Sequence, residues 1–422
     1  MRRTGNIANN IDWITVTLFY LLILLGWLNI FASVFDENTP QNIFDIGINS
    51  GRQLIFIGTT IILVILILAV DNNFYNTFAY IIYGAVILLL IYVFLFAKEI
   101  NGAKSWLQIG GFSLQPSEFA KFSTALVLAK FMSSQSFRIT KLRDQVILAV
   151  IIGLPVGLII LQGDSGTALV FGAFLLVLFR EGLSPIILLG GIGAAVLFIL
   201  TLLLPQIYLL PAFGVIVLIA FILGKRSFKR FGILLGIYAL IAGTINGVDF
   251  AFHQILKPHQ QNRILVLINP NTDPLGAGWN VTQSKIAIGS GGIFGKGYLN
   301  GTQTKGDFVP EQSTDFIFST IGEEHGWIGS LILISLFTLL LLRIIYIAER
   351  QKQKFSRIYG YSVASILFAH FTINIGMTIG LFPVIGIPLP FFSYGGSSLL
   401  AFTILLFILL KLDSHRNQIL AH

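Results

Sequence analysis

Two acidic residues stand where a long polar stretch of the chain meets an apolar one. Glu311 and Asp315 are four residues apart, which places both on one face if the segment is helical. A carboxylate where the chain re-enters lipid is costly and is a candidate functional group. An aspartate in this position could instead cap the next helix. Asp315 alone does not decide between a site and a cap.

A second pair of charges lies inside an apolar helix. Glu118 and Lys121 are three residues apart, so both project from one face of a predicted helix over residues 117–133, near its outer end. They could be a simple intrahelical ion pair. If Asp315 lies at the same depth, the three form a polar cluster of the kind found at catalytic and transport sites. We expect Asp315 to pair with Lys121 there.

Four cations are predicted on the outer side of the membrane, against the usual preference of Lys and Arg for the cytoplasm. They are Lys104, Arg263, Lys285 and Lys296. Such cations can receive an anionic ligand, and pyrophosphate is the obvious one. Each taken alone could also be a solvated loop charge. Trp106 could pack its ring on a sugar or belong to the interfacial aromatic belt.

The elements that must position these residues are membrane helices. Of 422 residues, 55% are hydrophobic and 11% are charged, against about a quarter charged in a globular domain. Runs long enough to span a bilayer core of about 30 Å recur from end to end, and the alternating segments of a β-barrel are absent. The prediction is an all-α polytopic membrane protein with one integral membrane domain over residues 1–422. The absence of cysteine excludes disulfides, cysteine-ligated zinc and thiol nucleophiles.

Breaks at Gly, Pro and charge clusters divide the chain into twelve predicted spans. With both termini in the cytoplasm, the connections rich in Lys and Arg fall on the cytoplasmic side. The net charge of +8 therefore reports topology, and no nucleic-acid partner is predicted. The region 250–325 is too long for a normal connection and is predicted to be a large extracytoplasmic loop that carries the active site. The spans are predicted near residues 11–34, 52–70, 74–96, 117–133, 145–161, 166–180, 184–204, 207–223, 231–249, 326–346, 358–382 and 392–412.

The segment 380–398 contains too many prolines and glycines for one continuous helix. Irregular backbone at membrane depth is tolerated where it is buried in protein or lines a wet cavity, so we predict a broken helix beside a site. The six histidines show no paired metal-ligand spacing, and no metal site is predicted.

Short ordered motifs recur over most of the chain. They lie at 101–106 (NGAKSW), 115–121 (QPSEFAK), 164–167, 262–263, 273–278 (DPLGAG), 283–292 (QSKIAIGSGG), 301–303, 310–311, 314–318 (TDFIF) and 388–397 (PLPFFSYGGS). Together these motifs resemble the SEDS family of membrane glycosyltransferases, which includes RodA, FtsW and SpoVE. The Gly-Thr-Gln stretch at 301–303 is more similar to the RodA branch than to FtsW.

The chain also departs from the family pattern. Gln312 and Ser313 stand where RodA-like proteins commonly have Arg-His, which removes a histidine but leaves Asp315 in place. The stretch 162–167 reads Gln-Gly-Asp-Ser-Gly-Thr where the family has Gln-Pro-Asp-Leu-Gly-Thr. The family usually has ten spans, so two of the twelve are surplus and are expected within 184–249.

The resemblance implies a SEDS-type helical bundle in the bacterial cytoplasmic membrane that polymerises lipid II into glycan strands at the outer face. It implies as partners a class B penicillin-binding protein that crosslinks the strands and other proteins of the elongation complex. The family's essential aspartate corresponds to Asp315, and its neighbouring lysine and glutamate to Lys121 and Glu118. No cofactor is assigned, and a pyrophosphate leaving group leaves Mg²⁺ or Mn²⁺ open. The residues expected to contact substrate are Arg263, Lys285, Lys104, Trp106, Glu311 and Ser393.

Three alternative functions remain at this point. A flippase for the lipid-linked precursor would also use a charged cavity beside a broken helix, although no clear internal repeat supports it. The chain could instead be an FtsW-like polymerase specific for division. It could also be a scaffold that only holds the crosslinking enzyme, in which case the polar cluster would have no purpose.

Overall fold

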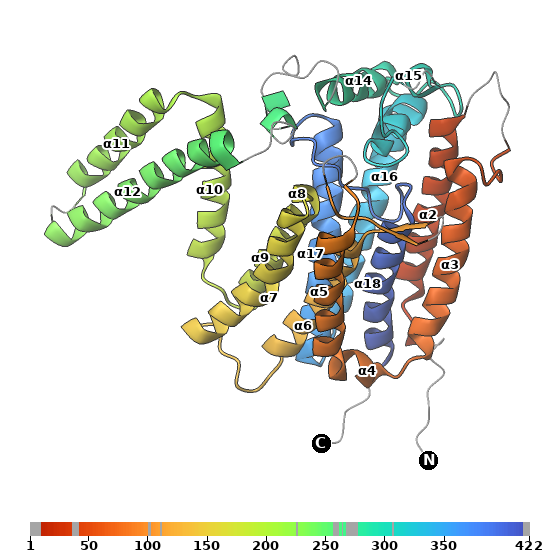
Figure 1. The fold of residues 1–422 in the computed structure, drawn as a ribbon, viewed down its shortest axis with the longest axis horizontal. Helices are drawn as coiled ribbons and strands as arrows, with labels where there is room; N and C mark the ends of the chain where they lie inside the picture. The colour runs from red at the N-terminus through yellow and green to blue at the C-terminus, as the bar shows by residue number, and fades with distance from the viewer. Residues whose placement is uncertain are drawn as a thin grey trace. The chain divides into compact units, whose positions relative to one another are not determined.

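The fold of this chain is almost entirely helical in the computed structural model (Figure 1), which confirms the predicted class. The chain divides into two compact units, one formed by Met1–Gly182 with Asn280–His422 and the other by Leu183–Trp279. The structure describes residues 10–35, 42–99, 103–109, 112–224, 227–255, 261–263, 265–266, 277–305 and 308–416.

The first unit contains most of the helices and one β-hairpin. In the hairpin, β1 (Leu107–Ile109) pairs antiparallel with β2 (Phe112–Leu114). A short 3-10 turn at Phe171–Ala173 separates two helices within the predicted span 166–180. The helices are α2 (Trp13–Val34), α3 (Asn49–Ala69), α4 (Asn72–Thr77), α5 (Ala79–Phe96), α6 (Pro116–Met132), α7 (Leu142–Leu161), α8 (Ser165–Val170), α9 (Phe174–Arg180), α14 (Ala277–Ser290, which begins in the second unit), α15 (Thr302–Lys305), α16 (Ile317–Glu349), α17 (Lys354–Thr378) and α18 (Gly396–Ser414).

The second unit contains the helices α10 (Pro185–Leu203), α11 (Gln206–Ile222) and α12 (Phe228–Phe250). Helix α12 packs against both α10 and α11. Pro185 begins α10, and the Ser184 side chain caps that helix by accepting from the Ile186 N–H. A π-helical turn at Ala251–Ile255 follows α12.

Every predicted span contains helix in the described part of the chain. Eight helical segments are long and apolar enough to cross a membrane, and three shorter apolar helices accompany them. The twelve crossings and the cytoplasmic termini stay predictions. The largest difference at a boundary is in α16, which begins at Ile317, nine residues before the expected start of that span, and continues across a kink at Gly326.

Helix α6 forms the interior of the first unit. It packs against α5, α7, α17 and α18, and most of its side chains are buried. Figure 1 shows α6 and α18 beside α17 in the middle of this unit. Because protein rather than lipid surrounds α6, the helix tolerates Glu118 and Lys121 in its first turns.

The segment between α17 and α18 is not helical, which confirms the predicted break. Residues 379–395, called the broken segment below, include Gly380, Gly386 and Gly395 at positive φ. Phe391 also has positive φ, an uncommon backbone conformation for a side chain of this size. The segment packs closely on α2, where a Cβ added to Gly26 would lie 2.5 Å from the Phe392 carbonyl oxygen.

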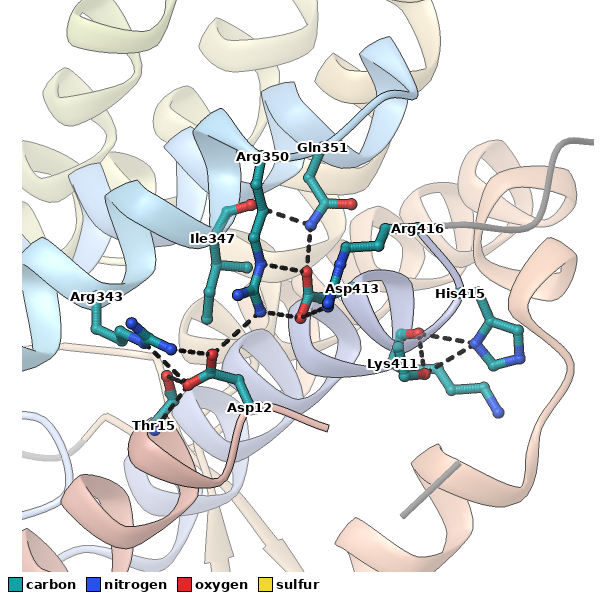
Figure 2. A network of polar contacts seen from close by, with 11 residues as sticks. Asp12, Thr15, Arg343, Ile347, Arg350, Gln351, Lys411, Asp413, His415 and Arg416 are labelled. Carbon is teal, nitrogen blue, oxygen red and sulfur yellow. Dashed lines mark hydrogen bonds and ion pairs between the residues drawn. The ribbon is translucent and has the colours of Figure 1, made fainter. Parts of the chain in front are cut away.

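An ion network ties the start of α2 to the ends of α16 and α18 (Figure 2). Asp12 caps α2 by accepting from the Thr15 N–H, and its Oδ2 lies 2.7 Å from Arg343 Nη2 and 3.1 Å from Arg350 Nη2. Arg350 also binds the buried Asp413 through both its Nε and its Nη2. Burial is the largest single influence on the pKa of Asp12 and would raise it, but hydrogen bonds from Arg343 and Thr15 hold it at about 2.

Candidate functional site

Lys121 is fully buried in α6 and has polar contacts on two sides. Its Nζ donates to Glu118 Oε2 at 2.8 Å and lies 2.7 Å from His370 Nε2 on α17. The Nζ also lies 4.6 Å from the centre of the Phe402 ring on α18. Two charged groups that are each about 2% exposed need such additional partners, because burial removes their hydration.

The structure gives Lys121 an ion-pair partner other than the expected Asp315, and the pairing with Asp315 stays a prediction. The ion pair of Lys121 is made with Glu118, one turn earlier on the same helix, where the spacing brings the two side chains together. This is the intrahelical pair that the sequence left as an alternative. It is joined by His370, a contact that an intrahelical pair alone does not predict.

Asp315 lies in the turn that leads into α16 and is half-buried. The N-cap residue of α16 is Phe316, so Asp315 does not occupy the capping position considered above. Its backbone carbonyl accepts from Asn374 Nδ2 at 2.8 Å. Its carboxylate lies over the broken segment, since a Cβ added to Gly386 would be 3.2 Å from Asp315 Oδ2.

Hydrogen bonds join the turn before α16 to the broken segment. Ser393 Oγ donates to the Thr314 carbonyl at 2.6 Å and accepts from the Leu389 N–H at 2.9 Å. The Tyr394 N–H donates to the Ser313 carbonyl at 2.9 Å. These bonds hold Asp315 in a fixed position relative to the broken segment.

Asp164, which sequence reasoning quoted only within a motif, joins two helix starts beside this region. Its Oδ2 accepts from Gln115 Nε2 at 2.9 Å and from Ser117 Oγ at 3.2 Å, and its Oδ1 caps α8 at the Thr167 N–H. The α8 start also touches the broken segment, where a Cβ on Gly166 would lie 2.2 Å from the Ile385 carbonyl oxygen. The starts of α6 and α8 are therefore joined beside the broken segment, which lies against the Asp315 carboxylate.

Lys285 is the predicted outward cation that the structure brings to the broken segment. A Cβ added to Gly380 would lie 2.7 Å from Lys285 Nζ. Ser284 Oγ donates to the Thr378 carbonyl at 2.9 Å and thereby fixes α14 on the end of α17. The exposed Lys285 ammonium therefore lies at the start of the segment whose middle contacts Asp315.

The remaining predicted residues occupy varied positions. Lys104 is exposed and Trp106 is half-buried, beside the β-hairpin. Glu311 is exposed and accepts from Thr314 Oγ1 at 2.9 Å. Arg263 is half-buried in the second unit.

Two further polar groups have structural partners. Lys296 binds the buried Glu323 at 2.7 Å, and Ser393 is buried with the hydrogen bonds described above. Among the described residues, no group of three or more His, Asp and Glu could hold a metal ion.

Comparison with known proteins decides the family. A family model described as cell cycle protein, which covers FtsW, RodA and SpoVE, matches residues 12–212 and 207–418. The chain belongs to the FtsW/RodA/SpoVE family. This is the SEDS family that the motifs resemble, so the resemblance is confirmed.

The relatives match over nearly their whole length. Peptidoglycan glycosyltransferase RodA of Treponema pallidum is 34% identical over 93% of this chain and 95% of the relative. Peptidoglycan glycosyltransferase MrdB of Escherichia coli K12 is 34% identical over 94% of each chain. The crystal structure of the rod shape determining protein RodA of Thermus thermophilus matches with a TM-score of 0.63 at 25% identity, over 97% of this chain and 98% of that chain.

Family membership and the apolar helices make this a multi-pass protein of the bacterial inner membrane.

The departure at Gln312 from the usual RodA-like pattern has a structural use. Gln312 Nε2 donates to the Ser33 carbonyl at 2.6 Å and to the Thr304 carbonyl at 2.9 Å, which ties the turn before Asp315 to α2 and α15. A neutral amide therefore anchors this turn.

Proposed function

We propose that this protein is a peptidoglycan glycosyltransferase that polymerises lipid II into glycan strands at the outer face of the membrane. One observation carries the proposal: α17 contacts Lys121 through His370, and through Asn374 it binds the broken segment that lies against the Asp315 carboxylate. The names of the RodA and MrdB relatives, which are 34% identical over more than nine tenths of this chain, support the same activity.

The proposed reaction joins two lipid-linked sugars. The 4-hydroxyl oxygen of the acceptor's GlcNAc forms a bond to the anomeric carbon of the donor, the bond from that carbon to the pyrophosphate oxygen breaks, and the hydroxyl proton goes to a base. Undecaprenyl pyrophosphate leaves with the bonding electrons. The reaction therefore needs a proton acceptor and a cation near the leaving group.

Asp315 is the proposed base, because it corresponds to the essential aspartate that the family resemblance implies and is half-buried beside the broken segment. Its carboxylate lies over Gly386, and hydrogen bonds from Ser393 and Tyr394 fix the turn before it on this segment.

Lys121 is the proposed cation for the leaving pyrophosphate, held in place by Glu118 and His370. The exposed Lys285 ammonium is proposed to assist from the start of the broken segment. Contacts of Arg263, Lys104, Trp106, Glu311 and Ser393 with substrate stay predictions. Positioning of the two sugars is expected to supply much of the rate, since a fixed geometry replaces a bimolecular encounter.

The test is polymerisation of labelled lipid II by purified protein in detergent, where no movement across a bilayer can be scored. Glycan polymer supports a transferase, and its absence with the cognate partner added would leave the flippase and scaffold alternatives. The Asp315→Asn variant is expected to make no polymer. Glu349→Gln is a matched control, because it makes the same change at an exposed carboxylate at the other end of α16.

We also propose a crosslinking partner, a class B penicillin-binding protein. Support comes from a solved structure titled for the coordination of polymerization and crosslinking by a peptidoglycan synthase complex, which matches 97% of this chain with a TM-score of 0.68 at 28% identity. Copurification of this protein with a tagged penicillin-binding protein encoded by the same genome tests the partner. Separate elution of the two in mild detergent would reject it.

A further inference from the structure

His370 is a buried side chain at the meeting point of α6, α17 and the broken segment. Its Nε2 lies 2.7 Å from Lys121 Nζ, and its Nδ1 lies 3.2 Å from the Pro388 carbonyl oxygen. Its ring packs edge-on against the Phe402 ring, with 4.7 Å between centroids. In the sequence His370 is a lone histidine without metal-ligand spacing, so its contact with Lys121 could not be predicted from the sequence.

The two contacts define one form of the His370 ring. An ammonium can only donate hydrogen bonds, so Nε2 must accept from Lys121. The ring proton then lies on Nδ1, where it can donate to the Pro388 carbonyl. A doubly protonated ring would bring two cations within 2.7 Å of each other in a buried place, which is strongly unfavourable. Both nitrogens of the neutral ring are therefore in use.

The same face of α17 also holds Asp315. Asn374 lies four residues after His370, so the two side chains are neighbours on the helix. Asn374 Nδ2 donates to the Asp315 carbonyl at 2.8 Å and to the Ile387 carbonyl at 2.7 Å. The consecutive carbonyls of Ile387 and Pro388 are thus held by Asn374 and His370, next to the Gly386 backbone that faces the Asp315 carboxylate.

We propose that His370 is a positioning residue for glycan polymerisation. It fixes the Lys121 ammonium to the Pro388 peptide group and so sets the separation between that cation and Asp315. The inference rests on the proposed function, because positioning by His370 matters only if Lys121 and Asp315 take part in the transfer reaction. His370 itself is fully buried and acts through Lys121 rather than on the sugars.

Three substitutions at this position test the proposal in the lipid II assay with the full-length protein. His370→Gln keeps an acceptor for Lys121 and a donor for Pro388, and we expect kcat within about threefold of wild type. His370→Ala loses both contacts, and we expect kcat to fall by about tenfold or more, with KM for lipid II changed by less than about threefold. His370→Asn is too short to reach both partners and should resemble His370→Ala.

A matched control lies on the same helix. Tyr359 is also fully buried, and its hydroxyl donates to the Leu405 carbonyl at 3.0 Å rather than to Lys121, His370 or the broken segment. Tyr359→Phe removes one buried hydrogen bond from α17 and is expected to keep wild-type kcat. Thermal stability of each variant in detergent is measured alongside.

The outcomes separate this inference from the proposed function. Wild-type kcat in His370→Ala, or equal activity of His370→Gln and His370→Asn, would overturn the positioning role while the transferase stands. Equal losses of kcat in His370→Ala and Tyr359→Phe would assign His370 to general stability and would also overturn it. A wild-type protein that makes no polymer would reject the proposed function itself and remove the basis of the positioning role.

Discussion

Arg350 is the centre of the ion network that joins α2, α16 and α18, and its replacement should destabilise the fold strongly (Figure 2). It contacts Asp12 and Asp413, whose side chains are 2% and 0% exposed. An Arg350→Met substitution preserves much of the apolar stem but leaves these buried carboxylates with fewer partners. Loss of one partner from a buried ion pair typically costs about 3–5 kcal/mol.

The remaining contacts set the size of the expected effect. Asp12 keeps Arg343 at 2.7 Å, and Asp413 keeps Arg416 at 3.2 Å and Gln351 at 2.8 Å. The cost of Arg350→Met should therefore lie near the lower end of that range, about 3 kcal/mol, which corresponds to a fall in melting temperature of roughly 3 °C. The melting temperature of Arg350→Lys should lie between those of Arg350→Met and wild type, because an ammonium keeps the charge but cannot reproduce the paired donors of a guanidinium.

The assay is thermal unfolding of the detergent-purified protein, with Arg180→Met as the matched control. Arg180 pairs with Glu349 at 2.9 Å, but the two side chains are 53% and 50% exposed. An exposed pair of this kind contributes about 0–1 kcal/mol, so the control should shift the melting temperature by less than about 2 °C. Equal shifts in Arg350→Met and Arg180→Met would refute the argument that burial makes the network matter.

Two further predictions concern Asp12 and Gly26. The pKa of Asp12 is about 2, below its ordinary value of 3.8, so its contribution of about 2 kcal/mol is complete only above about pH 5 and is lost as the pH falls toward 2. The stability advantage of wild type over Asp12→Asn should therefore shrink over that range, and a constant difference would contradict the pairing. A Gly26→Ala substitution places a Cβ 2.5 Å from the Phe392 carbonyl oxygen and should destabilise the fold by about 1–3 kcal/mol. Gly58→Ala is the control, because open space surrounds that position and no loss of stability is expected. Thermal unfolding of both variants checks this, and equal stability would mean that α2 and the broken segment separate freely.

Local sequence patterns predicted the helices and the break between α17 and α18 because lipid and backbone geometry act over a few residues. The lengths of the apolar runs in the sequence located the helices, and the prolines and glycines of 380–398 located the irregular segment. The start of α16 was placed too late, because Glu323, Glu324 and His325 interrupt the apolar pattern. These residues lie in the helix before the kink at Gly326, where both glutamates are buried in protein.

Contacts between distant segments could not be read in the same way. Lys121 and His370 are 249 positions apart, and Asp12 and Arg343 are 331 positions apart. Spacing within one helix predicted that Glu118 and Lys121 share a face, and it correctly offered their ion pair as an alternative. It gave no means of choosing Asp315, Glu118 or His370 as the partner of Lys121, because that choice depends on how α6 packs against α17.

The most direct test of the central claim compares lipid II polymerisation by wild type, Asp315→Asn, Lys121→Ala and the Glu349→Gln control, each verified as folded and bound to the partner. The account predicts polymer from wild type and Glu349→Gln, none from Asp315→Asn, and a large loss of rate in Lys121→Ala. Full activity in Asp315→Asn would contradict the assignment of this carboxylate as the base.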